Sequence, residues 1–366
     1  MRLTYLALPM SVFAVSLAWA PAASAATPAA TRWIVLLKEK PVVERYPGRI
    51  EKTRPAAEPY RQHLQQVQAG LRPQIEGLHA RVTGSLQHLL NGIFVVATPA
   101  QAAALRKLPG VKAVTRMRQY RRADQDSMSN VSQAWAVPAI GGETNAGAGV
   151  KIGMIDTGID QTNPAFQDPT LTPPSGYPIC DVRPSDCPTL PSQCAYTNNK
   201  IIVARSYVCE IVYADSTNSA DLAAQSRPDD LSARDLVGHG TGTASVAAGM
   251  PVTYNGTTIT GVAPKAFLGN YKVFGSDDVN PSGSGNIYQA LEDAVTDGMD
   301  VVNMSLGSPA WYSGPLDEDS TYCPSTGLPN SPIPIPTDSC DPLAYEVENA
   351  MDNALVTVVV VPAIRA

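Results

Sequence analysis

The sequence predicts an α/β protein, with a parallel sheet flanked by helices, preceded by a smaller ferredoxin-like α+β unit. The runs Val150 to Ile155 and Met299 to Met304 are apolar without the alternation of a half-exposed strand, which is typical of parallel strands covered on both faces. Helical patterns such as Ile287 to Asp297 alternate with these runs. A β-α-β-β-α-β order between Thr31 and Val114 predicts the smaller unit.

The first residues have the features of an export signal. Met1-Arg2 leads into an apolar stretch from Leu6 to Trp19, and Ala23-Ser24-Ala25 follows as a small-residue cleavage site. Residues 1–25 are therefore expected to be a secretory signal peptide, and the protein to be secreted, to the extracellular space or the periplasm. No other segment reaches the roughly 18 unbroken apolar residues of a membrane span, so we expect no membrane association.

The smaller unit is expected over residues 31–122. Its patterns, in chain order, are a strand at Thr31 to Lys38, a helix at Tyr60 to Ala80, a turn and strand at Leu90 to Val96, a helix at Ala100 to Leu108 and a closing strand at Val111 to Val114. The second helix is expected to end before Pro109-Gly110, since neither residue favours a helix interior.

Charge divides the chain into two blocks. From Arg32 to Arg122 there are 17 Lys or Arg against 5 Asp or Glu, whereas from Ala123 onward there are 9 against 28. A basic block can bind nucleic acid. Here an acidic block follows it in the same chain, so the simpler interpretation is mutual attraction between the two blocks. We therefore expect no nucleic-acid partner.

All six cysteines lie after the predicted signal. An even number in an exported chain predicts disulfides, with the connectivity left open. Cys323 with Cys340 is the one pair we suggest. A zinc site is the rival interpretation, but the spacings contain no C-x2-C element and no second histidine lies near His239, so no metal is expected. Cysteine and proline are concentrated in a predicted insertion at residues 168–235.

Two residues carry the candidate chemistry. Asp156 closes the apolar run that begins at Val150, so a carboxylate ends a buried strand. His239 lies between Gly238 and Gly240 at a predicted helix start, where neither neighbour has a side chain that could shield its ring. Imidazole is the usual general base near neutral pH, and a carboxylate can hold it in the required tautomer.

The order of these residues, Asp and then His, is that of subtilisin rather than of chymotrypsin or the α/β-hydrolases. The motif from Gly238 to Gly249, followed by Gly261-Val262-Ala263-Pro264, resembles the subtilisin-like serine proteases (peptidase S8). The resemblance implies an endopeptidase in which Asp156 and His239 are catalytic, with residues 130–366 as a partial catalytic domain and proteins or peptides as substrates. Asp-Thr-Gly at residues 156–158 also suggests an aspartic protease, but that class needs a second such aspartate.

The same resemblance implies further roles. Gly283, Ser284 and Gly285, and Ser305, Leu306 and Gly307, match the two edge segments between which substrate binds as an extended strand. Leu90 to Ile93 and Leu108 to Val111 make residues 31–122 similar to an inhibitor I9-type propeptide, which would act as an intramolecular inhibitor. Calcium is a family cofactor, but the expected ligand aspartate is Ala165 here, so no cofactor is expected.

The end of the sequence departs from the family pattern. Leu355 to Val361 resembles the strand that precedes the oxyanion asparagine, yet neither that asparagine nor the nucleophilic serine follows in its expected context. Codons for Val361 to Ala366, regrouped by one base, can encode Ala-Gly-Asn-Ser-Gly, which is the family's continuation. We therefore expect a frame shift near Val361 and an inactive chain as written. The alternative is a non-enzymatic pseudoprotease or propeptide-type protease inhibitor.

Overall fold

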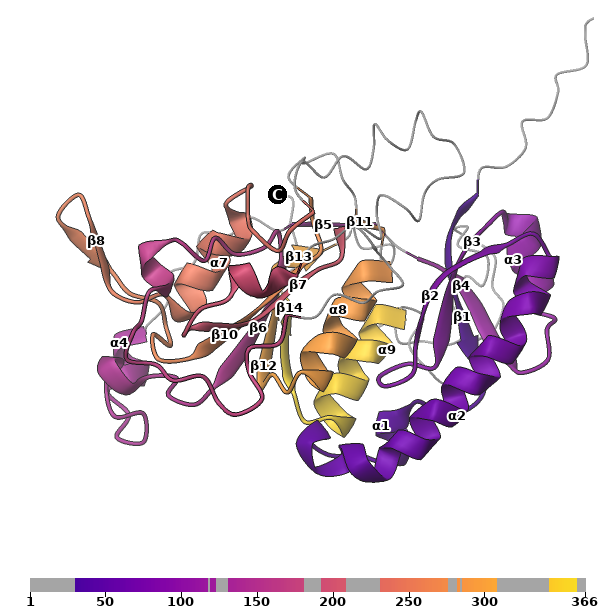
Figure 1. The fold of residues 1–366 in the computed structure, drawn as a ribbon, viewed down its shortest axis with the longest axis horizontal. Coiled ribbons are helices and arrows are strands. Elements are labelled where there is room, and N and C mark those ends of the chain that lie inside the picture. The colour runs from indigo at the N-terminus through magenta and orange to yellow at the C-terminus, as the bar shows by residue number, and fades with distance from the viewer. Residues whose placement is uncertain are drawn as a thin grey trace, which may run out of the picture.

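A computed structural model describes residues 30–117, 119–122, 131–180, 192–208, 231–275, 282–283, 285–307 and 342–360. Two units lie side by side (Figure 1). We call residues 30–117 the N-terminal unit and the described residues from 131 onward the sheet unit. The predicted signal peptide, Ser284 and the suggested pair of Cys323 with Cys340 lie outside the described residues.

The N-terminal unit is a four-stranded antiparallel sheet with helices, as predicted. The strand order is β2-β3-β1-β4, so β1 lies between β3 and β4. Its elements are β1 (Thr31–Leu37), α1 (Val42–Arg45), α2 (Ile50–Gly77), β2 (Arg81–Leu86), β3 (Gly92–Ala97), α3 (Pro99–Leu105) and β4 (Val111–Arg116).

Two details of this unit differ from the sequence prediction. Helix α2 begins at Ile50 rather than Tyr60, although Pro55 and Pro59 lie inside it. Burial of Ile50, Ala57, Tyr60 and Leu64 along one side of the helix explains how packing outweighs the weak helix propensity of proline. Strand β2 had no clear pattern, because most of its residues are half-buried.

The sheet unit is built on five parallel strands in the order β14-β12-β6-β10-β7, with β6 at the centre. The strands are β6 (Lys151–Asp156), β7 (Ile201–Ser206), β10 (Phe267–Lys272), β12 (Val301–Met304) and β14 (Thr357–Val360). The main helices are α7 (His239–Ala248), α8 (Gly285–Thr296) and α9 (Pro342–Glu348), and the smaller elements are α4 (Val131–Trp135), η1 (Glu143–Asn145), η2 (Pro164–Phe166), η3 (Gln193–Tyr196), η5 (Asn349–Asn353) and the pair β8 (Val252–Tyr254) and β9 (Thr257–Ile259).

Helices cover both faces of this sheet. Ile152 and Met154 of β6 share a core cluster with Ala244 of α7, whereas Ile155 belongs to a second cluster with Ile287 of α8. Side chains of one strand thus alternate between two buried layers. This explains why the strands read as apolar runs, and it confirms the predicted parallel α/β fold.

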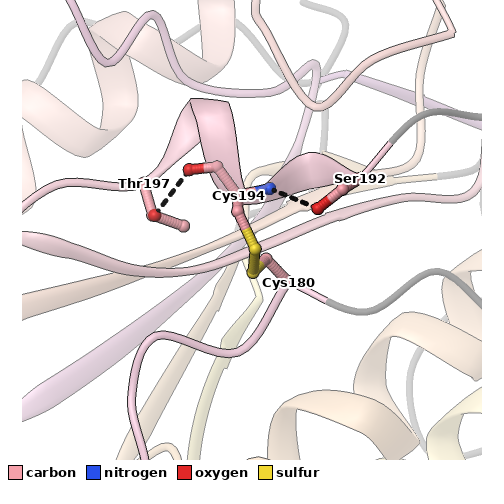
Figure 2. Close-up of a disulfide and its surroundings, with 4 residues drawn as sticks. All are labelled: Cys180, Ser192, Cys194 and Thr197. Atoms are coloured by element: carbon pink, nitrogen blue, oxygen red, sulfur yellow. Dashed lines mark hydrogen bonds between the residues drawn. A yellow bond between two sulfur atoms is a disulfide. The ribbon is translucent and has the colours of Figure 1, made fainter.

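The predicted insertion at 168–235 is not wholly an insertion, because it contains the sheet strand β7. A disulfide between Cys180 and Cys194 ties η3 to the chain that precedes it, as Figure 2 shows. Cys194 N–H donates to Ser192 Oγ (3.4 Å), and Thr197 Oγ1 donates to Cys194 O (2.8 Å). The two cysteines are 14 positions apart in the sequence. Closing a loop of about that length stabilises a fold by about 3 kcal/mol in the chain-entropy treatment.

The two units share a core. One apolar cluster includes Leu89 and Phe94 of the N-terminal unit together with Tyr288 and Leu291 of α8, and the rings of Phe94 and Tyr288 lie 5.8 Å apart. The N-terminal unit therefore packs against α8 as the layers within a domain do.

Polar contacts also hold the N-terminal unit against α8, and we call this contact region the seam. The Glu292 carboxylate of α8 accepts hydrogen bonds from the backbone N–H groups of Gln87 (3.1 Å), His88 (3.1 Å) and Leu89 (3.2 Å). Arg49 of the basic block lies 2.5 Å from Asp300, which is the kind of contact that the charge division predicted. No helix in the described part of the chain is long and apolar enough to cross a bilayer.

We expect Glu292→Gln to destabilise the chain by about 1–3 kcal/mol, because an amide cannot accept all three N–H groups and brings donors of its own. Denaturant unfolding measures this change. Glu76→Gln is the control, since the Glu76 side chain is 49% exposed and pairs with Arg72 of the same helix. Equal stability of the two variants would contradict the prediction.

Candidate active site

The structure brings Asp156 and His239 together. Asp156 ends the central strand β6 and is buried, and its Oδ1 lies 2.7 Å from His239 Nδ1. Thr157 N–H donates to the same carboxylate oxygen (2.6 Å), and Thr243 Oγ1 donates to Oδ2 (3.2 Å). Both oxygens of Asp156 are therefore held by groups from the two elements that the site joins.

His239 is the first residue of α7, and its side chain is 11% exposed. Because an ionised carboxylate can only accept hydrogen bonds, the Asp156 contact assigns the proton to Nδ1 in the neutral ring. Nε2 is then left with a lone pair. This is the arrangement of a general base oriented by a carboxylate.

Glycine allows the strand end and the helix start to approach closely. A Cβ on Gly240 would lie 2.1 Å from the Gly158 carbonyl oxygen, and Gly158 has a φ of +104°. Gly240 N–H donates to Thr157 Oγ1 over 2.8 Å. The glycines of both motifs thus bring Asp156 within reach of His239.

A short chain segment lies between the two predicted substrate-binding edges. Strand β5 (Gln119–Arg122), which follows the N-terminal unit, is antiparallel to β11 (Ser282–Gly283) on one side and to β13 (Leu306–Gly307) on the other. Gly283 is opposite Gln119, and Gly307 is opposite Arg121. The three strands form a sheet of their own beside the parallel one (Figure 1).

The predicted edge residues are not equivalent in the structure. Gly285 begins α8 instead of continuing the strand. Ser305 is buried and accepts a hydrogen bond from Asn303 Nδ2 (3.0 Å), and Leu306 is 1% exposed. Gly283, Leu306 and Gly307 therefore supply the paired backbone.

The sequence reasoning missed three polar residues around the pair. Thr157 and Thr243 donate hydrogen bonds to the Asp156 carboxylate. The third residue, Asp235, accepts hydrogen bonds from the hydroxyls of Thr157 and Thr241. Each lies within four positions of a predicted catalytic residue. A search for hydroxyl and carboxyl groups next to the two motifs would have found them.

Ala165 stands where the resemblance implies a calcium ligand in other members. It is buried in η2, in the core cluster that also contains Ala244 of α7. Its methyl group packs against apolar neighbours and offers no oxygen. Within the ranges that the structure describes, no three His, Cys, Asp or Glu residues gather as a metal set.

A buried carboxylate at the carboxyl end of the central parallel strand is thus hydrogen-bonded to a histidine at a helix start. Residues 147–361 match the family model described as "Subtilase family". The chain belongs to the subtilase family.

Individual relatives agree with this assignment. The chain is 31% identical over 247 residues to "Subtilisin-like protease SBT2.6" of Arabidopsis thaliana, a match that covers 64% of this chain and 28% of the relative. It is 33% identical over 251 residues to "Subtilisin-like protease SBT2.1" of the same plant, covering 61% and 26%. The matched region thus spans less than a third of these relatives' length.

Among solved structures, one similar chain is the "Epidermin Leader Peptide Processing Serine Protease (EpiP)" of Staphylococcus aureus, with 16% identity, a TM-score of 0.46, and 90% of this chain and 59% of that chain covered. Another is fervidolysin of Fervidobacterium pennivorans, with 14% identity, a TM-score of 0.42, and 92% and 40% covered.

We expect Gly240→Ala to separate the strand end from the helix start and to cost about 1–3 kcal/mol or more, because the new methyl group meets a backbone oxygen. Gly242→Ala is a matched control in the same helix, where a Cβ meets nothing within 4 Å. There the change should be neutral or stabilising by up to about 1 kcal/mol. Thermal unfolding of both variants measures the difference, and similar midpoints would refute the steric explanation.

Proposed function

We propose that this chain is the precursor of a secreted subtilisin-like serine endopeptidase, which hydrolyses peptide bonds with an Asp-His-Ser triad. The observation that carries the proposal is the hydrogen bond of 2.7 Å between His239 Nδ1 and Asp156 Oδ1, made within a family-matched region.

In this mechanism His239 is the general base. Its Nε2 takes the proton of the nucleophilic serine as the serine oxygen attacks the peptide carbonyl, and then gives that proton to the leaving amine. Asp156 holds the ring in the required tautomer and stabilises its charged form. Thr157 and Thr243 keep the carboxylate directed at Nδ1.

The proposed substrate is an unfolded or flexible stretch of a protein that binds as a strand. Strand β5 pairs in an antiparallel manner with β11 and β13, and a peptide in its position would use the same backbone groups. In this proposal Gly283, Ser284 and Gly285, with Ser305, Leu306 and Gly307, form the substrate-binding edges. Main-chain pairing gives general affinity, and side-chain pockets would give preference.

Residues 31–122, which comprise the N-terminal unit and β5, are proposed to be the propeptide and an intramolecular inhibitor. The contacts of the N-terminal unit with Glu292 and Asp300 and its shared core with α8 hold it on the sheet unit. Strand β5 follows it in the chain and fills the edge site, so a peptide substrate would have to displace it.

Secretion is proposed from the signal pattern at residues 1–25 and from the disulfide of Cys180 with Cys194. Disulfides persist in oxidising compartments, such as the extracellular space and the periplasm.

We further propose that the 366 residues by themselves do not hydrolyse peptides. A histidine base without a nucleophile has nothing to activate, and loss of the serine alone costs roughly 10⁶-fold in kcat in this kind of triad. The occupied edge site favours a second candidate, a non-enzymatic inhibitor of other proteases.

Expression with export tests these proposals. The 366-residue form should leave casein intact and its N-terminal unit uncleaved, whereas a version with the reading frame restored at codon 361 should hydrolyse casein and be blocked by a serine-directed inhibitor. Activity of the 366-residue form would contradict the proposed inactivity. An inactive restored form that inhibits another subtilase would favour the second candidate.

The folding stability of the chain should depend on pH through His88. Burial, followed by the charges of Arg54 and Arg61, lowers the pKa of His88 to about 4 from the ordinary 6.5. As pH falls from 6.5 towards 4, the unfolded chain binds a proton at His88 that the folded chain does not, so stability falls over this range.

The thermal midpoint of the chain should therefore drop between pH 6.5 and pH 4, and His88→Gln should reduce the drop. His63→Gln is the control, because the His63 side chain is 51% exposed. A drop of the same size in the wild-type chain and in His88→Gln would exclude this role for His88.

A further inference from the structure

Asp235 lies in the loop before α7, is buried, and accepts five hydrogen bonds. Its Oδ1 accepts from Thr157 Oγ1 (3.0 Å) and from the backbone N–H groups of Val237 and Gly238 (both 2.9 Å). Its Oδ2 accepts from the N–H (2.9 Å) and the hydroxyl (2.6 Å) of Thr241. One carboxylate thus binds the turn after β6 and the first turn of α7 at the same time.

The two threonine hydroxyls complete the connection. Thr157 Oγ1 also accepts from Gly240 N–H (2.8 Å), and Thr241 Oγ1 also accepts from Asp160 N–H (3.0 Å). A hydroxyl has a single proton to donate, and an ionised carboxylate can only accept. Asp235 therefore fixes the direction of both hydroxyl bonds, and each hydroxyl is left to receive an N–H group from the opposite element.

The backbone that carries Asp235 is anchored to the parallel sheet. Asn270 Nδ2 donates to Ala233 O (2.8 Å), and Lys272 Nζ donates to Arg234 O (2.6 Å). Both side chains come from β10, which pairs with β6 so that Lys272 lies opposite Asp156. The strand beside the one that bears Asp156 thereby sets the position of Asp235.

We propose that Asp235 is the positioning residue of the Asp156–His239 pair, acting through Thr157 on one side and Gly238 on the other. Among the described residues, its side-chain hydrogen bonds go to groups within two positions of Asp156 or His239, not to the side chains of that pair. The inference rests on the proposed function only in treating this pair as the triad carboxylate and base. A purely structural aspartate would stabilise the fold without controlling the Nδ1 contact.

The Nδ1 proton of His239 reports this control directly. The sequence contains four histidines, so selective isotope labelling of histidine in the full chain gives four ring signals, and His239→Gln assigns one of them. In Asp235→Asn, an NH2 group replaces one of the two acceptor oxygens. In either orientation of the amide, this NH2 group faces N–H or O–H groups that also donate, so their hydrogen bonds are lost. The Nδ1 proton of His239 should then exchange with water about tenfold faster, the equivalent of one net hydrogen bond.

Asp168→Asn is the matched control. Asp168 is also buried, and its recorded partners are Thr170 and Lys265. This variant should lose stability while the His239 signal is unchanged. An unchanged Nδ1 exchange rate in folded Asp235→Asn, or an equal change in Asp168→Asn, would overturn the proposal.

If Asp235→Asn does not fold, Thr157 tests the same connection from the other side. Thr157→Val removes the hydroxyl with little change of shape, whereas Thr157→Ser keeps it. Faster exchange in the valine variant and near wild-type exchange in the serine variant would support the proposal, and equal exchange in both would overturn it. No peptidase activity is measured, so failure of the proposed function leaves this result interpretable, and the reverse also holds.

Discussion

The close contact between the turn after β6 and the first turn of α7 is the constraint on which the site depends. Gly158 and Gly240 allow two backbones to approach to a distance that no side chain would permit. Asp156 and His239 each lie within two residues of these glycines, so their hydrogen bond of 2.7 Å is a consequence of backbone packing. Burial of β6 under helices on both faces then keeps the turn from shifting.

The seam between the two units is likewise held by close packing, here together with hydrogen bonds. Helix α8 contributes Tyr288 and Leu291 to a cluster that the N-terminal unit completes, and Glu292 binds three N–H groups at its edge. Removing the N-terminal unit would expose this apolar surface and leave that carboxylate without those donors. We therefore expect the sheet unit to be less stable without the N-terminal unit.

What the sequence predicted was local. An unbroken apolar run that ends in Asp156, and a histidine between glycines, are properties of adjacent residues, and both were confirmed as a strand end and a helix start. The role of Glu292 depends on backbone groups 203 to 205 positions away, so no local pattern could indicate it. The start of α2, from Ile50 to Pro59, was missed because Pro55 and Pro59 argue against a helix that tertiary burial stabilises.

The shared core also explains how β5 can occupy the edge site. Each of its two partners, β11 and β13, is only two residues long, and a net backbone hydrogen bond contributes about 0.5–1.5 kcal/mol. Burial of one large apolar side chain contributes about 1.5–3 kcal/mol, and the seam buries several. Most of the free energy that holds β5 in place therefore arises at α8, away from the edges that it covers. If substrate binds at these edges as proposed, a peptide without such a unit would gain only the edge contacts and would bind more weakly, unless its side chains filled pockets of their own.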